Sequence, residues 1–115
     1  VVASVDGQPF LLRLIMALHH AGVRRIILAL GHRAQDVLSD IFGLFPSDVQ
    51  IISSIERKAL GTAGALRHAL PLINSETVLV ANGDSFIDGD LPSFMAFHRS
   101  VKAKISMLLC EVPDI

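Results

Sequence analysis

The sequence predicts an α/β fold in which a mostly parallel sheet is flanked by helices. Short apolar runs, such as residues 25–30 and 77–81, are typical of strands that are buried on both faces of a sheet. Segments with apolar residues at helical spacing lie between these runs. Because the two kinds of segment alternate and their connections are short, the pattern favours parallel β-α-β units.

Hydrophobic spacing and helix-end signals define the first elements. Residues 9–20 are expected to form a helix, with Pro9 in its first turn and Gly22 at its C-terminal stop. The apolar face of this helix comprises Phe10, Leu11, Leu14, Ile15 and Leu18. Residues 25–30 are expected to form a buried strand, and a second helix is expected over residues 33–42.

The second half of the chain continues the alternation. Further strands are expected at residues 49–53, 77–81 and 104–112. Thr62 is a suitable N-cap for a third helix that ends before Pro71, and Asp90 can cap a fourth helix that runs through Arg99. Together these elements predict one Rossmann-like domain over residues 1–115. A doubly wound unit normally begins with a strand, so an N-terminal strand is expected to be missing here.

Composition limits the classes of function. The net charge is −1, which provides no basic field to recruit nucleic acid. No apolar run approaches the ~18 residues that a bilayer-spanning helix needs, so no membrane segment is expected. Cys110 is the single cysteine, which rules out a disulfide within the chain and makes the cytoplasm the expected compartment.

The connection over residues 60–65 is the first candidate site. Leu60, Gly61, Thr62 and the small residues after them join an expected strand to an expected helix. Small side chains let a flat group approach the backbone, and a helix N-terminus offers unpaired N–H groups. The pattern indicates a nucleotide or phosphate platform. The alternative is a tight strand-to-helix turn whose small residues serve packing alone.

Glu56 lies five residues before Gly61 and is a candidate reader of guanine. A carboxylate can accept two hydrogen bonds from one planar partner. Guanine presents two adjacent donors, N1–H and the 2-amino group, whereas adenine and the pyrimidines do not. The alternative is a solvated acid that pairs with Arg57 or Lys58.

Asp84 is the candidate metal ligand, because it follows an apolar run at the edge where parallel α/β sheets bind ligands. Mg²⁺ commonly takes one or two carboxylates together with phosphate oxygens and water. Gly83 lets the backbone turn and approach a ligand. The alternative is a turn residue, a position that favours aspartate in any case. Asp88 is better explained as a turn residue, and Asp90 as a helix cap.

Five blocks of the sequence resemble the sugar-phosphate nucleotidyltransferase family, and they occur in the family's order. The blocks are Asp6-Gly-Gln-Pro-Phe-Leu11, Gly22-Val-Arg-Arg-Ile26 with Gly31-His-Arg33, Glu56 through Ala65, Asn82-Gly-Asp-Ser85, and Asp88-Gly-Asp-Leu91 with Phe97-His-Arg99. The third block resembles the family's E-x-x-x-L-G-T-A-G-A loop. Together the blocks cover nearly the whole chain. The nearest subgroup is that of the guanylyltransferases acting on heptose 1-phosphate or mannose 1-phosphate.

The resemblance implies a reaction and a role for each candidate residue. A sugar 1-phosphate would attack the α-phosphorus of an NTP, with a preference for GTP, to give a nucleotide-sugar and pyrophosphate. The loop from Glu56 to Gly61 would hold the base, with Leu60 and Thr62 in the same loop. Asp84 would bind the Mg²⁺ cofactor, and Asn82 with Gly83 would approach the sugar phosphate or the ribose.

The sequence also departs from the family pattern. The family's G-x-G-T-R loop and its lysine would precede residue 1, and its second metal-binding aspartate would follow Ile115. Lys58 and Ala59 replace the more usual acidic residue and proline. We therefore expect weak or no turnover. Besides a chance match of motifs, the alternative is a non-catalytic nucleotide-binding or assembly module that kept the fold.

The resemblance places the missing N-terminal strand between the strand at residues 26–30 and the strand at residues 78–81. Without it, two apolar strand edges must pair with each other or with another chain. Open edges invite association, so a homo-oligomer is expected.

Overall fold

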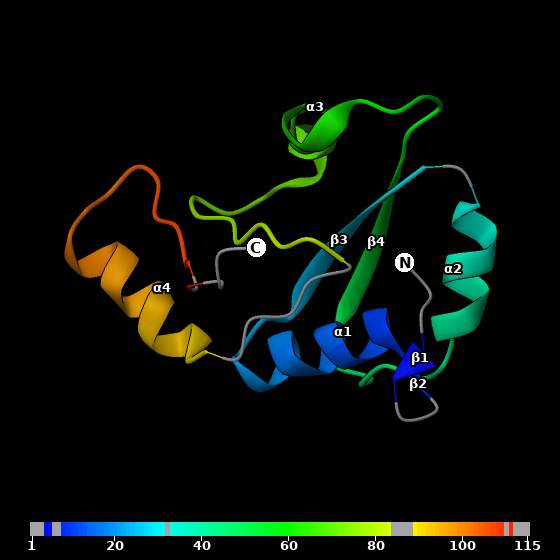
Figure 1. Ribbon diagram of the computed structural model, residues 1–115, viewed down its shortest axis with the longest axis horizontal. Coiled ribbons are helices and arrows are strands. Elements are labelled where there is room, and N and C mark those ends of the chain that lie inside the picture. Colours follow the sequence, from blue (N-terminus) through cyan, green and yellow to red (C-terminus); the bar gives the residue numbers. More distant parts are fainter. Residues whose placement is uncertain (1–3, 6–7, 32, 84–88, 110, 112–115) are drawn as a thin grey trace.

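The computed structural model describes residues 4–5, 8–31, 33–83, 89–109 and 111 of the 115-residue chain. Short strands β1 and β2 precede a series of helices and two longer strands (Figure 1). The elements are β1 (Ser4–Val5), β2 (Gln8–Pro9), α1 (Phe10–His20), β3 (Arg25–Leu30), α2 (Ala34–Ile41), β4 (Gln50–Ile55), α3 (Gly61–Ala69), the 3-10 helix η1 (Leu70–Leu72) and α4 (Leu91–Ser100). The predicted α/β fold is confirmed, with a parallel sheet and flanking helices.

The central pair of strands is parallel. β3 and β4 are in register over six residues each, from Arg25 opposite Gln50 to Leu30 opposite Ile55. Their isoleucines and leucines suit a pleated surface that is covered by helices. The connection from β3 to β4 runs through α2, which is the crossover that two neighbouring parallel strands require.

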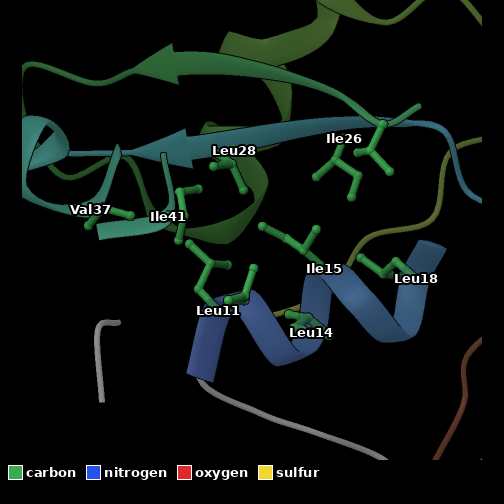
Figure 2. Packing of buried hydrophobic residues seen from close by; sticks show 10 residues of the cluster. Leu11, Leu14, Ile15, Leu18, Ile26, Leu28, Val37 and Ile41 are labelled. Atoms are coloured by element: carbon green, nitrogen blue, oxygen red, sulfur yellow. The ribbon is translucent and has the colours of Figure 1, made fainter. Parts of the chain in front are cut away.

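The hydrophobic core lies between α1, α2 and β3. Figure 2 shows Leu11 and Ile15 of α1 pointing toward Ile26 and Leu28 of β3, with Ile41 of α2 beside them. Ile15 and Ile41 are the most completely buried side chains, each 1% exposed. The predicted apolar face of the first helix is therefore confirmed for its leucines and isoleucine, because helical spacing places them on one side of α1.

Two predicted strands are wrong. Residues 77–81 form no strand, and neither do the described residues of 104–112. A strand is stable only when a neighbour satisfies its backbone N–H and C=O groups. Within the described residues, the only parallel pairing is that of β3 with β4, so these two apolar segments have no strand beside them.

The predicted helix boundaries agree with the structure where the capping interaction is local. Asp90 caps α4 as predicted, since its carboxylate accepts a hydrogen bond from the Ser93 backbone N–H at 3.1 Å. The Ser93 hydroxyl donates to the same carboxylate at 2.7 Å. These bonds lower the pKa of Asp90 below its ordinary value. Thr62, by contrast, is not the N-cap of α3: the helix begins at Gly61, and Leu60 occupies the cap position.

A polar cluster on the surface ties the end of α1 to the segment before β4. His19 Nε2 lies 2.8 Å from one Asp48 carboxylate oxygen, and Arg24 Nε lies 3.2 Å from the other. Arg24 also donates to the His19 carbonyl at 2.7 Å, a helix-end C=O group that accepts from the Gly22 N–H as well, at 3.0 Å. None of the helices in the described part of the chain has the length and apolar character required to span a bilayer.

Asp48 makes the stability of this cluster dependent on pH. The hydrogen bond with His19 is the main cause that holds the pKa of Asp48 below its ordinary value of 3.8. A carboxylate whose pKa is lowered by folding stabilises the fold above its unfolded pKa, and the contribution is lost as pH falls through its folded pKa.

We therefore expect Asp48→Asn to be less stable than the wild type near neutral pH, with the difference shrinking below pH 3.8. Urea unfolding at a series of pH values measures this. Asp40→Asn removes a carboxylate from an exposed position of α2 and serves as the control. A stability difference that stays constant across the acidic range would contradict the assigned role of Asp48.

Candidate functional site

The candidate site begins at the edge where β3 and β4 both end. The backbone N–H of Glu56 donates to the Leu30 carbonyl at 2.7 Å, which extends the ladder by one residue beyond β4. Glu56 is half-buried, whereas Arg57 and Lys58 are exposed. Within the described residues, Glu56 forms no ion pair with Arg57 or Lys58. The pairing of Glu56 with Arg57 or Lys58, one part of the alternative, is therefore not observed.

The turn into α3 has the tight backbone that its small residues predict. Gly61 has φ of 73°, a conformation that residues with a Cβ rarely adopt. A Cβ on Gly64 would lie 2.8 Å from the Leu60 Cβ, so glycine at this position lets Leu60 sit over the first helical turn. Leu60 makes no side-chain capping bond, so no cap side chain occupies the first N–H groups of α3.

The helix after this turn is attached directly to β4. His68 Nε2 lies 3.0 Å from the Ile55 carbonyl, the last carbonyl of the strand. This contact ties the C-terminal turn of α3 to the end of β4, next to Glu56 in the chain. No local sequence pattern distinguishes His68 from an ordinary helix-surface histidine. Its partner is thirteen residues away in the chain and is known only from the tertiary structure.

The structure brings together one half of the predicted site. Glu56, Leu60, Gly61 and Thr62 belong to the single connection between β4 and α3, and Gly61 and Thr62 are exposed to solvent. Asn82 is also exposed and Gly83 is half-buried. The other half, centred on Asp84, lies outside the described residues, as do Ser85, Asp88 and His32.

The described residues contain no group of three histidine, cysteine or acidic side chains that could hold a metal ion. Asp84 therefore stays a prediction.

The segment that leads to Asp84 is anchored. Leu79, within the residues that were predicted to be a strand, packs against the hydrophobic core. The exposed fractions of Val78 and Val80, 47% and 52%, show that only one side of this segment is covered.

Comparison with known proteins identifies a family. The sequence profile described as Nucleotidyl transferase matches residues 1–114. A D-glycero-alpha-D-manno-heptose 1-phosphate guanylyltransferase of Aneurinibacillus thermoaerophilus is 32% identical over 108 residues, which are 94% of this chain and 46% of that protein. A mannose-1-phosphate guanylyltransferase of Mycobacterium tuberculosis is 29% identical, over 94% of this chain and 30% of that protein.

A solved structure supports the same assignment. The crystal structure of HddC from Yersinia pseudotuberculosis complexed with GMP-PN superposes with a TM-score of 0.78 at 32% identity, covering 84% of this chain and 43% of that one. The chain thus spans less than half the length of these relatives. Because the family profile covers almost the whole sequence and the fold agrees, this chain belongs to the nucleotidyl transferase family.

Proposed function

We propose that the chain forms part of a sugar-1-phosphate guanylyltransferase and contributes its base-binding loop. The observation that carries the proposal is Glu56, a half-buried carboxylate at the end of β4 without an ion-pair partner among the described residues. It adjoins a turn in which a Cβ on Gly61 would meet open space. The guanylyltransferase names of the relatives above support GTP as the nucleotide and a heptose or mannose 1-phosphate as the acceptor.

In the proposed reaction, a phosphate oxygen of the sugar 1-phosphate bonds to the α-phosphorus of GTP. The bond between the α-phosphorus and its bridging oxygen breaks, and pyrophosphate leaves. Glu56 accepts hydrogen bonds from guanine N1–H and the 2-amino group. Leu60, Gly61 and Thr62 line the approach to the base. Such chemistry depends on positioning and on charge stabilisation more than on a protein nucleophile.

We propose Asp84 as the Mg²⁺ ligand, with Asn82 and Gly83 near the ribose or the sugar phosphate. Mg²⁺ commonly takes one or two carboxylates together with phosphate oxygens and water, so the carboxylate of Asp84 suits the ion. When bound, the metal would neutralise phosphate charge. Glu56, on the described side of the site, would keep the nucleotide in register for that interaction.

A second candidate is a nucleotide-binding or assembly module without catalysis. We also propose that the chain self-associates and that it resides in the cytoplasm, where a lone cysteine stays reduced.

Titration with GTP in the presence and absence of Mg²⁺ tests the proposal. We expect GTP binding that weakens at least tenfold when Mg²⁺ is removed or when Asp84 is replaced by alanine, because Asp84 would hold an ion that neutralises phosphate charge. Asp40→Ala, on an exposed position of α2, is the matched control. Failure to bind GTP would contradict the proposed function, and binding indifferent to Mg²⁺ and to Asp84 would contradict the metal site.

The same samples, mixed with mannose or heptose 1-phosphate, distinguish an enzyme from a binding module. We expect weak or no pyrophosphate release from this chain. Robust release that disappears in Asp84→Ala would establish an active enzyme and exclude the module.

A further inference from the structure

The peptide unit that joins Ile55 to Glu56 is bonded on both of its sides. Its N–H, which belongs to Glu56, donates to the Leu30 carbonyl of β3 at 2.7 Å. Its carbonyl oxygen, which belongs to Ile55, lies 3.0 Å from His68 Nε2 of α3. The N–H and C=O groups of a trans peptide point in opposite directions. The unit is therefore held by β3 from one side and by α3 from the other.

The hydrogen bond of His68 uses a carbonyl that the sheet leaves available. The N–H groups of Gln50 and Glu56 both face β3. Backbone groups alternate between the two edges of a strand, so the Ile55 carbonyl is directed away from β3. Because a carbonyl oxygen only accepts, Nε2 of His68 is the donor, in the neutral ring or in the imidazolium. His68 thus supplies a bond that β3 cannot supply.

The helix that carries His68 is itself attached at a second point. The chain continues from α3 directly into η1, where the Leu72 carbonyl accepts from Arg25 Nη2 at 2.7 Å. Arg25 is the first residue of β3, so it begins the strand whose last residue, Leu30, bonds Glu56. The two contacts hold α3 and η1 against both strands, and the position of His68 is set by the fold.

We propose that His68 is a positioning residue for guanine recognition, because it fixes the peptide unit from which the Glu56 side chain begins. The inference rests on the proposed function, in which Glu56 reads the base. The Cα of Glu56 belongs to the same planar unit, so any rotation of that unit displaces the carboxylate. Hydrogen bonds to guanine require donor–acceptor distances of about 2.7–3.2 Å, so a small displacement is enough to weaken them.

A residue that acts through Glu56 should have a selective effect. Loss of a residue that only stabilises α3 would change the binding of every nucleotide alike, whereas loss of His68 should matter only for a base that Glu56 reads. His68 is exposed, so its truncation opens no cavity in the core. Water would then replace it at the Ile55 carbonyl, and the peptide unit would lose its fixed direction.

Calorimetric titration with GTP and with ATP, both with Mg²⁺, tests this role. We expect His68→Ala to weaken GTP binding about three- to tenfold, the equivalent of one net hydrogen bond, and to leave ATP binding unchanged. His68→Gln should bind GTP within about twofold of the wild type, because its amide can donate to the same carbonyl. The matched control is His20→Ala, which removes an exposed histidine from the last turn of α1.

A double variant shows whether His68 acts through Glu56. In the Glu56→Gln background, His68→Ala should cause no further loss of GTP binding, since the two residues act as one unit. An additive loss, an equal loss for GTP and ATP, or wild-type GTP affinity in His68→Ala would each overturn the positioning role while leaving the proposed function intact. A wild type that binds no GTP would overturn both.

Amide hydrogen exchange followed by NMR examines the same peptide unit without nucleotide. We expect the Glu56 N–H to exchange at least about threefold faster in His68→Ala than in the wild type. The N–H of Ser54, which lies within β4 and is buried, should exchange equally slowly in both proteins. Equal exchange of the Glu56 N–H in the two proteins would overturn the inference that His68 fixes this unit.

Discussion

Replacement of Ile15 by alanine is expected to lower the free energy of unfolding by about 2–5 kcal/mol. Ile15 is 1% exposed and lies between α1 and the strand residues of the core (Figure 2). Its truncation loses the free energy gained by transferring the side chain from water into the core. It also leaves a cavity that the rigid neighbouring side chains cannot fill. The total free energy of unfolding of a native domain is roughly 5–15 kcal/mol, so the variant is expected to be close to unfolding.

Urea unfolding followed by far-ultraviolet circular dichroism measures this loss. Met16→Ala is the matched control, because Met16 is the next residue of α1 and is 44% exposed. Ile15→Val should cost only about 0.5–1.5 kcal/mol, since it removes one methylene. A loss below about 1 kcal/mol for Ile15→Ala would contradict the assignment of this residue to the centre of the core.

Replacement of Glu56 by glutamine is expected to weaken GTP binding about 10- to 100-fold while leaving the weaker binding of ATP unchanged. A carboxylate offers acceptors to both guanine donors. The amide offers one acceptor and one donor, so its NH₂ group would face the guanine N1–H or the 2-amino group and repel it. Adenine does not present this pair of donors, so its binding should not change. The preference for GTP over ATP should therefore be lost together with the affinity for GTP.

Calorimetric titration of both nucleotides measures the effect, and Glu76→Gln serves as the control. Glu76 is exposed and lies in the segment after η1, so its variant should bind GTP like the wild type. If Glu56→Gln retains its preference for GTP, Glu56 is not the guanine reader, although the family assignment would be unaffected. The two predictions are independent, because the first concerns the core and the second concerns a loop at the sheet edge.

The family and the constrained turn between β4 and α3 could be recognised from local sequence. Gly61, Gly64 and Glu56 lie within nine residues, and the structure confirms a constrained turn between β4 and α3. The contact of His68 with the Ile55 carbonyl could not be recognised, because a histidine on a helix surface has the same sequence pattern whether or not a strand end lies beside it. The relation of Asp84 to this turn stays a prediction.

The sequence by itself determined the helices and the cap at Asp90. Helix hydrogen bonds close within the segment, and the Asp90 carboxylate finds its donor only three residues away at Ser93. The sequence also determined that β3 and β4 would be strands, since a short crossover through α2 brings them together. These features need little information from distant parts of the chain.

Only the tertiary structure decided which apolar segments become strands. Residues 25–30 and 77–81 have the same apolar character, yet the first pairs with β4 and the second has no strand beside it in the described part of the chain. The physical reason is that a strand's backbone groups are satisfied by a different segment, so its formation depends on whether a partner is present at the right place.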